Sequence, residues 1–525
     1  MRKITGSSLS LLVATATTVV VLSCNSDQFT GSSAKKRPTA FSGGDQNRCL
    51  PEPLPNIAIT PKKLFTYLPP APSAQFTQFA STAMTGRLDP ADTSPSIIAI
   101  GFEKVAGVCN GAVASPGRIF AVDGKDGRHK WTGRNGSGEA IPLDASVAPA
   151  LGDVNGDGKM EVFAIEHTTE KVVALNHDGV KIWNSTESTG SRTAASRISP
   201  EWIHGISLAD LDRDGSTELI APGMVLDART GALKFSLAKG QHAYPADTNL
   251  QGTMEIVLGT GIVNSSGTTI CRFEKNLANL GIARLHKDDP FLTVIGPTWE
   301  APPNPADSTK LVAYRGDNCQ EIFSVPLGDS GGGPPNIADL DGKDDQGLEI
   351  GIAGKTRYAV FDNTGKVLWS RPTQDASSAR TGSTAFDFNG DGRTEVVYND
   401  EYFLRVFDGQ TGNVIYEAPN TSYTAHEYPV VADVDGNGTA NIVAVSNSCI
   451  GGDISGVHVF SEPEDRWVNT RPIWSQYGFN PLSMKDDGSV TGTDADAILR
   501  GALPSPHLAG FRNNIAFPRD QAACK

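Results

Sequence analysis

Short apolar runs separated by polar turns recur along most of this chain. One example is Met160-Glu-Val-Phe-Ala-Ile165, which follows a polar, glycine-rich turn. A run of this length, rich in branched and aromatic side chains, predicts a β-strand. The abundance of glycine (55) and proline (33) fits many short strands joined by turns. The pattern therefore predicts an all-β protein.

An acidic loop of fixed spacing precedes several of these strands. It offers side-chain oxygens at positions 1, 3 and 5, a glycine at position 6 and a carboxylate at position 9, inside the following apolar run. Calcium prefers six to eight oxygen ligands, and a glycine lets the loop turn sharply around the ion. An EF-hand differs, because its closing glutamate is at position 12. The complete copies are Asp153-Val-Asn155-Gly-Asp157-Gly158 with Glu161, Asp210-Leu-Asp212-Arg-Asp214-Gly215 with Glu218, and Asp387-Phe-Asn389-Gly-Asp391-Gly392 with Glu395.

Five further copies of the loop are incomplete. The copy with Asp433, Asp435 and Asn437 ends in Asn441 instead of an acid, which predicts weaker binding. The copy with Asp339, Asp341 and Glu349 contains two extra residues, and the copy from Asp247 to Glu255 lacks the carboxylate at position 5. Segments 89–92 and 286–289 are more eroded. We expect Ca²⁺ at the three complete loops and, more weakly, at the 433 and 339 loops. A solvated acidic turn without a metal is the alternative, above all for the eroded copies.

A second mark of the repeat is an aromatic residue that closes a strand after a polar turn. The spacing of these residues is close to 40–50, and strands and hairpin turns at that period predict a β-propeller with one four-stranded sheet per blade. We expect each unit to run acidic loop, apolar strand, polar turn and strand with closing aromatic, and the aromatics to pack between blades. The closing residues are Trp131, Trp183, Phe235, Phe273, Phe323, Trp369, Tyr416 and, less regularly, Trp467.

Eight units follow from the two marks, starting near residues 84, 149, 206, 245, 282, 335, 383 and 429. Eight blades are therefore expected. Seven blades plus a decorated one are the alternative, because ring closure can borrow strands from the chain ends. The propeller is predicted over residues 84–470, with an N-terminal segment 49–83 leading into it and a tail 471–525 packing on it. Residues 296–309, which include Trp299, are expected to form a loop insertion.

The loops followed by strands resemble FG-GAP (VCBS) repeats, which occur in integrin α-like propellers and in bacterial surface proteins. The resemblance covers about residues 84–470, although the Phe-Gly and Gly-Ala-Pro motifs that give the repeat its name are absent. It implies a β-propeller and calcium ligation at the loop residues named above. It implies neither a ligand nor a reaction, because one fold serves many functions.

The N-terminus has the features of a secretory signal. Arg2 and Lys3 precede a mostly apolar stretch from Leu9 to Leu22, which is too short for a comfortable membrane span. The words Val21-Leu-Ser-Cys24 resemble the bacterial lipobox, so residues 1–23 are expected to be a leader and Cys24 the lipidated first residue. An ordinary signal peptide is the alternative. Residues 24–48 are expected to form a flexible tether.

Six cysteines remain when Cys24 is set aside, and an even count in an exported chain suggests disulfides, with 15 possible pairings. Cys109 and Cys449 follow equivalent strands of the first and the last unit, which ring closure would make neighbours. We therefore hypothesise a Cys109–Cys449 bond, with Cys49–Cys524 joining the termini.

The net charge of −14 argues against nucleic acid or an anionic membrane surface as a partner. Gly328-Asp-Ser330-Gly resembles a trypsin-like nucleophile segment, but no suitable His precedes it, and a glycine-rich blade connection explains it better. The nine His residues form no zinc spacing and are expected at turns or on the surface.

Two classes of function stay open. The first is a lipid-anchored, non-enzymatic propeller at the outer membrane or cell surface that binds a protein or glycan, its membrane contact limited to the anchor. The second is a calcium-dependent polysaccharide lyase, which would need a base and basic residues to hold an acidic sugar. We find no clear cluster of that kind in the sequence, so the binding protein is favoured.

Overall fold

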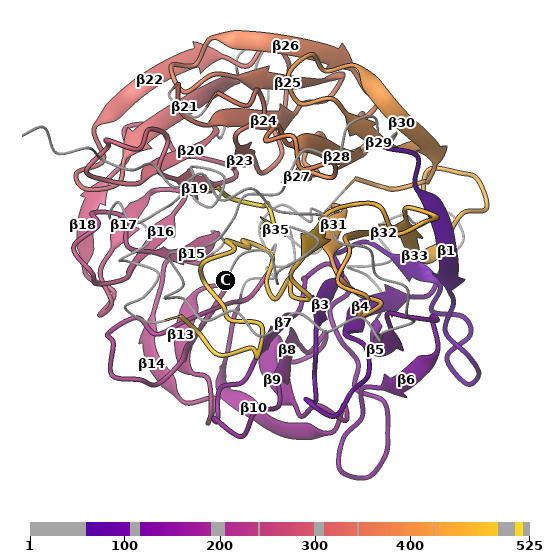
Figure 1. Cartoon of the computed structure of the whole chain (residues 1–525). Helices are drawn as coiled ribbons and strands as arrows, with labels where there is room; N and C mark the ends of the chain where they lie inside the picture. Colours follow the sequence, from indigo (N-terminus) through magenta and orange to yellow (C-terminus); the bar gives the residue numbers. More distant parts are fainter. Residues whose placement is uncertain are drawn as a thin grey trace, which may run out of the picture.

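The structure, a computed structural model, describes residues 59–104, 116–190, 205–239, 242–298, 309–343, 346–424, 426–491 and 510–517. These residues form eight antiparallel sheets arranged as the blades of one ring (Figure 1). The eight-bladed prediction is confirmed. The predicted leader, the tether and the cysteines Cys24, Cys49, Cys109 and Cys524 lie outside the described residues, as does Trp299.

Each of the first four blades runs from an inner strand at the axis to an outer strand at the rim (Figure 1). Blade 1 contains β2 (Gln78–Phe79), β3 (Met84–Gly86), β4 (Ser96–Phe102), β5 (Arg118–Asp123) and β6 (His129–Thr132). Blade 2 contains β7 (Ala150–Gly152), β8 (Glu161–Ile165), β9 (Lys171–Leu175) and β10 (Lys181–Ser188). Blade 3 contains β11 (Ser207–Ala209), β12 (Glu218–Ala221), β13 (Met224–Asp227) and β14 (Leu233–Ser236). Blade 4 contains β15 (Ala243–Ala246), β16 (Glu255–Leu258), β17 (Gly261–Val263) and β18 (Thr269–Arg272).

The remaining blades repeat this order, except that the last one uses a strand from the start of the chain. Blade 5 contains β19 (Gly281–Ala283), β20 (Thr293–Pro297), β21 (Lys310–Arg315) and β22 (Glu321–Pro326). Blade 6 contains β23 (Asn336–Ala338), β24 (Glu349–Ala353), β25 (Arg357–Phe361) and β26 (Val367–Pro372). Blade 7 contains β27 (Ser383–Phe386), β28 (Glu395–Asn399), β29 (Phe403–Phe407) and β30 (Val414–Pro419). Blade 8 contains β31 (Val430–Ala432), β32 (Asn441–Ser446), β33 (Gly456–Ser461) and β1 (Lys62–Tyr67).

The second and third strands of each blade form the core. Their side chains are almost all buried, as in β8 and β9, because both faces of the sheet pack against neighbouring blades. Two apolar strands therefore lie between the acidic loop and the aromatic strand, where the sequence pattern predicted one. Among the described residues, none belongs to a helix long and apolar enough to cross a bilayer.

Six closing aromatics pack between blades, each against the turn glycine of the next blade. That glycine has a positive φ between 69° and 85°, and an added Cβ would lie only 2.4–2.8 Å from the ring. Glycine is therefore required twice, for the backbone conformation and for the close approach of the ring. The pairs are Trp131 with Gly179, Trp183 with Gly231, Phe235 with Gly267, Phe323 with Gly365, Trp369 with Gly412 and Phe65 with Gly127.

The last of these pairs closes the ring and corrects one prediction. Phe65 lies on β1 opposite Val459 of β33 and contacts Gly127 of blade 1. The aromatic of the eighth unit is therefore Phe65 and not Trp467. Trp467 is fully buried beside Phe388 instead, with ring centroids 4.4 Å apart.

A disulfide replaces the aromatic contact between blades 4 and 5. Cys271 pairs with Ile262 in the same register in which Trp131 pairs with Ala121, so Cys271 holds the aromatic position. Cys319 holds the turn-glycine position, with φ of 60°, and the two are bonded with a Cα–Cα distance of 5.8 Å. The assignment of Phe273 as a closing aromatic was wrong. Its ring stacks on Tyr314 at 4.5 Å instead.

The Cys271–Cys319 bond is not among the pairs expected from the sequence, and it uses none of the four cysteines of those pairs. Cys449 lies between β32 and β33, and Cys109 lies outside the described residues. The flanks of their loops do meet, because Lys104 Nζ donates to Ser448 Oγ at 2.9 Å. The Cys109–Cys449 bond stays a prediction.

We expect Gly231→Ala to lower the free energy of unfolding by about 3 kcal/mol, from a left-handed backbone and overlap with Trp183. Gly138→Ala is the matched control, because Gly138 has φ of 91° and nothing within 4 Å of an added Cβ. It should cost only about 1–2 kcal/mol. Chemical denaturation of both variants would check this, and equal losses would contradict the role given to the aromatic contact.

The C-terminal segment fills the axis of the ring (Figure 1). Thr85 of β3 exchanges two backbone hydrogen bonds with Trp474, and Ile337 of β23 does the same with Phe511. Leu151 N donates to Ser475 O, and Ala385 N donates to Arg512 O. The small sheet of β34 (Asn469–Thr470) and β35 (Ala516–Phe517) joins the two parts of this segment. The tail thereby ties together the inner strands of several blades.

Candidate metal centres

The acidic loops connect the inner strand of a blade to its second strand. The closing residue is in each case the first residue of the second strand, as in β8, β12 and β28. Ladder register fixes its place, since Gly152 pairs with Glu161 and Ala209 with Glu218. The loops of all blades therefore lie at the same end of the strands.

One hydrogen-bond scaffold shapes six of these loops. The closing side chain turns back into the loop and accepts the backbone N–H of loop position 2. The distances from the backbone nitrogen to the side-chain oxygen range from 2.8 to 3.2 Å. The blade 4 loop, which lacks the carboxylate at position 5, makes the same bond through Glu255. The six bonds join Val154 to Glu161, Leu211 to Glu218, Thr248 to Glu255, Leu340 to Glu349, Phe388 to Glu395 and Val434 to Asn441.

The first aspartate of the loop caps the turn. Asp153 accepts the N–H groups of Gly156 and Gly158 at 2.7 and 2.8 Å. Asp433 accepts the equivalent N–H groups of Gly436 and Gly438 at 2.8 and 3.0 Å. The oxygens are thus oriented by the backbone, as an ion site requires, although such caps also occur in metal-free turns.

Burial makes these carboxylates costly as anions. It raises the pKa of Glu161 and of Glu349 to about 7, and that of Asp433 to about 8. Burial, followed by the neighbouring Asp387, raises the pKa of Glu395 well above its usual range. A cation bound in the loop would compensate for the lost hydration and for the repulsion between the acids.

The structure brings some predicted ligands together more closely than others. Carboxylate oxygens of Asp210, Asp212 and Glu218 lie within 4.8 Å of one another, and so do those of Asp339, Asp341 and Glu349. Asp214 and Asp391 accept the N–H groups of Ser216 and Arg393. The amides Asn155, Asn389 and Asn437 accept from Asp157, Asp391 and Thr439.

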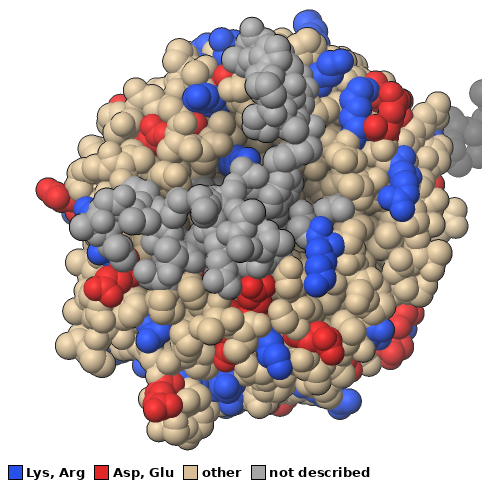
Figure 2. Space-filling view, turned by 180° about the vertical axis from the view of Figure 1, so that it is seen from behind, with Lys and Arg blue, Asp and Glu red and all other residues tan. Residues whose placement is uncertain are grey.

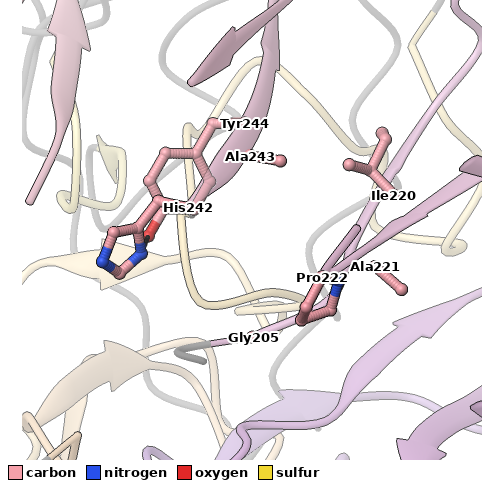
Figure 3. A pocket seen from close by; sticks show the side chains of 7 residues that line it. All are labelled: Gly205, Ile220, Ala221, Pro222, His242, Ala243 and Tyr244. Atoms are coloured by element: carbon pink, nitrogen blue, oxygen red, sulfur yellow. Dashed lines mark hydrogen bonds between the residues drawn. The ribbon is translucent and has the colours of Figure 1, made fainter. Parts of the chain in front are cut away.

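Buried polar groups at the axis were missed by the sequence analysis. His242 is 6% exposed and His426 is 1% exposed, so the expectation that histidines lie at turns or on the surface was wrong for them and for the buried His458. Tyr244 Oη lies 3.4 Å from His242 Nδ1 at a small cavity of about 10 Å³, lined also by Ile220 and Pro222 (Figure 3). Burial lowers the pKa of His242 well below its usual range.

Arg512 is the charged group at the centre of the ring. Its guanidinium is fully buried and lies 4.9–5.1 Å from the ring centroids of Tyr428, Tyr477 and Phe511. It also donates to the carbonyl of Pro335 at 3.3 Å. Cation–π contacts explain a buried arginine here as part of the packing of the tail.

The Gly328–Gly333 segment is the connection between blades 5 and 6. Asp329 accepts Ser330 N at 2.8 Å and Arg357 N at 3.1 Å. Gly333 lies so near the carbonyl of Thr381 that an added Cβ would be 1.9 Å from it. Close backbone approach therefore accounts for the glycine run, which agrees with the structural interpretation of this segment.

A buried acid, Asp375, organises the connection between blades 6 and 7. It accepts Ala379 N at 2.9 Å and Ser378 Oγ at 3.1 Å, and also the Thr424 hydroxyl. The donors favour the charged form, but burial outweighs them and raises the pKa of Asp375 to about 8. Burial therefore favours the protonated form of this acid in the folded protein.

We expect Asp375 to contribute stability that is lost as pH rises from about 4 to about 8, because unfolding releases its proton at the ordinary pKa of 3.8. Asp375→Asn should remove this loss, measured by chemical denaturation at several pH values in saturating calcium. The exposed Asp126→Asn is the control and should keep the parent slope. An unchanged slope in Asp375→Asn would contradict the assignment.

On the face in Figure 2, acidic and basic side chains alternate around the described surface. Neither sign gathers into one patch there.

The fold and the loops define the class of this chain: it is an eight-bladed β-propeller. A family model described as outer membrane protein assembly factor BamB matches residues 105–200, which is under a fifth of the chain. No curated protein matches the sequence.

Solved structures support the same class. The chain is similar to the V. cholerae biofilm matrix protein Bap1, with a TM-score of 0.73 and 19% identity over 88% of this chain and 99% of that one. It is also similar to a Bacillus licheniformis rhamnogalacturonan lyase, with a TM-score of 0.51 and 16% identity over 76% of this chain and 75% of that one. The rhamnogalacturonan lyase YesW gives a TM-score of 0.50 at 16% identity over 78% and 75%. At these identities the similarity concerns the fold.

Proposed function

We propose that this chain is a non-enzymatic adhesion or scaffold protein of the bacterial envelope, stabilised by calcium and anchored through a lipid on Cys24. The observation that carries the proposal is the combination of repeated acidic loops with an axis filled by the chain's own tail. The titratable groups at that axis, His242, His426 and Glu427, are buried. A buried group that packs the interior stabilises a scaffold, whereas catalysis needs a reachable one.

The structural similarity to a biofilm matrix protein, which covers nearly the whole length of that protein, supports a surface role for this chain. The calcium in this proposal is structural. An ion that binds only the folded loops stabilises the propeller by mass action. A protein or glycan would then bind on loops of the rigid ring.

The experiment compares bacteria that express the full chain with bacteria that express Cys24→Ala. We expect the parent chain in the membrane fraction, and its cells to adhere to a polysaccharide-coated surface in calcium but not in EGTA. The variant should be found outside the membrane fraction and give no adhesion. Adhesion of the parent cells no stronger than that of cells without the protein would overturn the proposal.

A lyase is the second candidate, favoured by the fold similarity to two rhamnogalacturonan lyases. It would depolymerise a uronate-containing polysaccharide and create unsaturated chain ends. Incubation of the purified full chain with rhamnogalacturonan in calcium distinguishes the two candidates. Unsaturated products, detected by ultraviolet absorbance, would favour the lyase over the scaffold.

A further inference from the structure

The outer strands differ between blades at one position, immediately before the closing residue. Six blades have an exposed aliphatic side chain there, 38–51% accessible, and blades 1 and 3 have Lys130 and Lys234. The aliphatic residues are Leu64, Ile182, Ile270, Ile322, Leu368 and Ile415. Blades 1 and 3 therefore have a basic residue at a position that is aliphatic in the other six blades.

Lys234 reaches from β14 into the acidic loop of its own blade. Its Nζ lies 2.5 Å from Glu218 Oε1 and 3.3 Å from Asp212 Oδ2. Both residues are predicted calcium ligands, and the Glu218 side chain is only 1% exposed. The ammonium thus bonds two of the three acids whose oxygens converge in this loop.

Lys130 makes the same approach in blade 1. Its Nζ lies 2.6 Å from Asp92 Oδ2 and 3.0 Å from Ser96 Oγ. Ser96 pairs with Gly86 as Glu218 pairs with Ala209, so it stands where the other loops have the closing acid. A lysine therefore occupies the loop in a blade that has lost the calcium pattern.

An ammonium and a calcium ion compete for the same oxygens. The ammonium carries a positive charge and three donors, and it needs no ligand cage. In blade 2 the position of Lys234 holds Ile182, and Glu161 Oε1 accepts from the neutral amide of Asn155 at 2.9 Å. In the blade 2 loop, Glu161 is therefore bonded to an amide and not to a basic side chain. The Asn155 amide can rotate and present its oxygen to an ion.

We propose that Lys130 and Lys234 are internal cations that take the place of calcium in blades 1 and 3. The 210–218 loop is then closed to calcium although its ligand spacing is complete. The inference rests on the proposed calcium role of the other loops, and among loops with a complete ligand spacing it makes the residue before the closing aromatic decide which ones bind metal.

The test is the calcium content of the full chain and three variants, measured by elemental mass spectrometry after dialysis against buffered free calcium. We expect Lys234→Met to bind one ion more than the parent, and Lys234→Arg, which keeps the charge, to bind the same number. Ile182→Lys should bind one ion fewer. Thermal unfolding in calcium and in EGTA accompanies each count, so that a misfolded variant is recognised and only folded chains are compared.

The outcomes separate the inference from the calcium proposal. Calcium in the parent with no gain in Lys234→Met and no loss in Ile182→Lys would overturn the inference alone. A parent and Ile182→Lys that bind no calcium would overturn the calcium proposal, and the inference with it. A gain in Lys234→Arg equal to that in Lys234→Met would also overturn it, because charge would not be the cause.

Discussion

Removal of calcium from the full chain with EGTA is expected to lower its melting temperature by about 10 °C. Each ion at a hundredfold excess over its dissociation constant adds about 2.7 kcal/mol, so three of the four loops left open to calcium, those of blades 2, 6, 7 and 8, add about 8 kcal/mol. An unfolding entropy of about 2 cal/mol/K per residue over about 400 ordered residues converts this energy into the shift. Without the ion, the buried acids Glu161 and Glu395 must be protonated or remain repelled by their neighbours. Differential scanning calorimetry at neutral pH measures the shift.

Glu395→Gln is the site-directed counterpart of this experiment. It removes one charged ligand but keeps an oxygen that can accept Phe388 N, as Asn441 accepts Val434 N in blade 8. Its melting temperature should respond less to EGTA than that of the parent. A parent that melts at one temperature in calcium and in EGTA would contradict a stabilising role for calcium.

Trp474→Ala is expected to destabilise the whole ring by about 3–5 kcal/mol, the usual cost of removing a large buried aromatic. Trp474 is fully buried in the axis and stacks on Phe479 with centroids 4.6 Å apart. Its backbone is bonded to Thr85 of blade 1, so loss of packing there also loosens the tail from the inner strands. Chemical denaturation of the full chain measures the loss.

The exposed Tyr402→Ala serves as the control for that variant, since Tyr402 is 42% accessible. It should cost less than about 1 kcal/mol. Equal losses in the two variants would mean that the tail does not contribute to the stability of the ring.

The blade number followed from the sequence because the repeat is local. The acidic loop and the turn that precedes an aromatic are short sequence motifs within one blade, and they recur in almost every unit. Phe65 could not be assigned in this way, because it reaches blade 8 from the other end of the chain. Cys271 and Cys319 were missed for another reason: they stand at an aromatic and a glycine position, which only the strand register identifies.

The candidate metal centres were likewise predictable only where their residues lie close together in the sequence. The spacing located the loop residues, but not the lysines, because Lys234 follows Glu218 by 16 residues and meets it only across the blade. Calcium binding, the lipid on Cys24 and the pairs Cys109–Cys449 and Cys49–Cys524 stay predictions.

The most direct test of calcium stabilisation is a count of calcium ions per folded chain, by native mass spectrometry of the full-length protein. Complete loops are present in blades 2, 3 and 7, weaker ones in blades 6 and 8, and Lys234 is proposed to close the blade 3 loop. The account predicts at least two ions, and up to four, that EGTA removes. A folded chain that binds no calcium at millimolar concentration would contradict it.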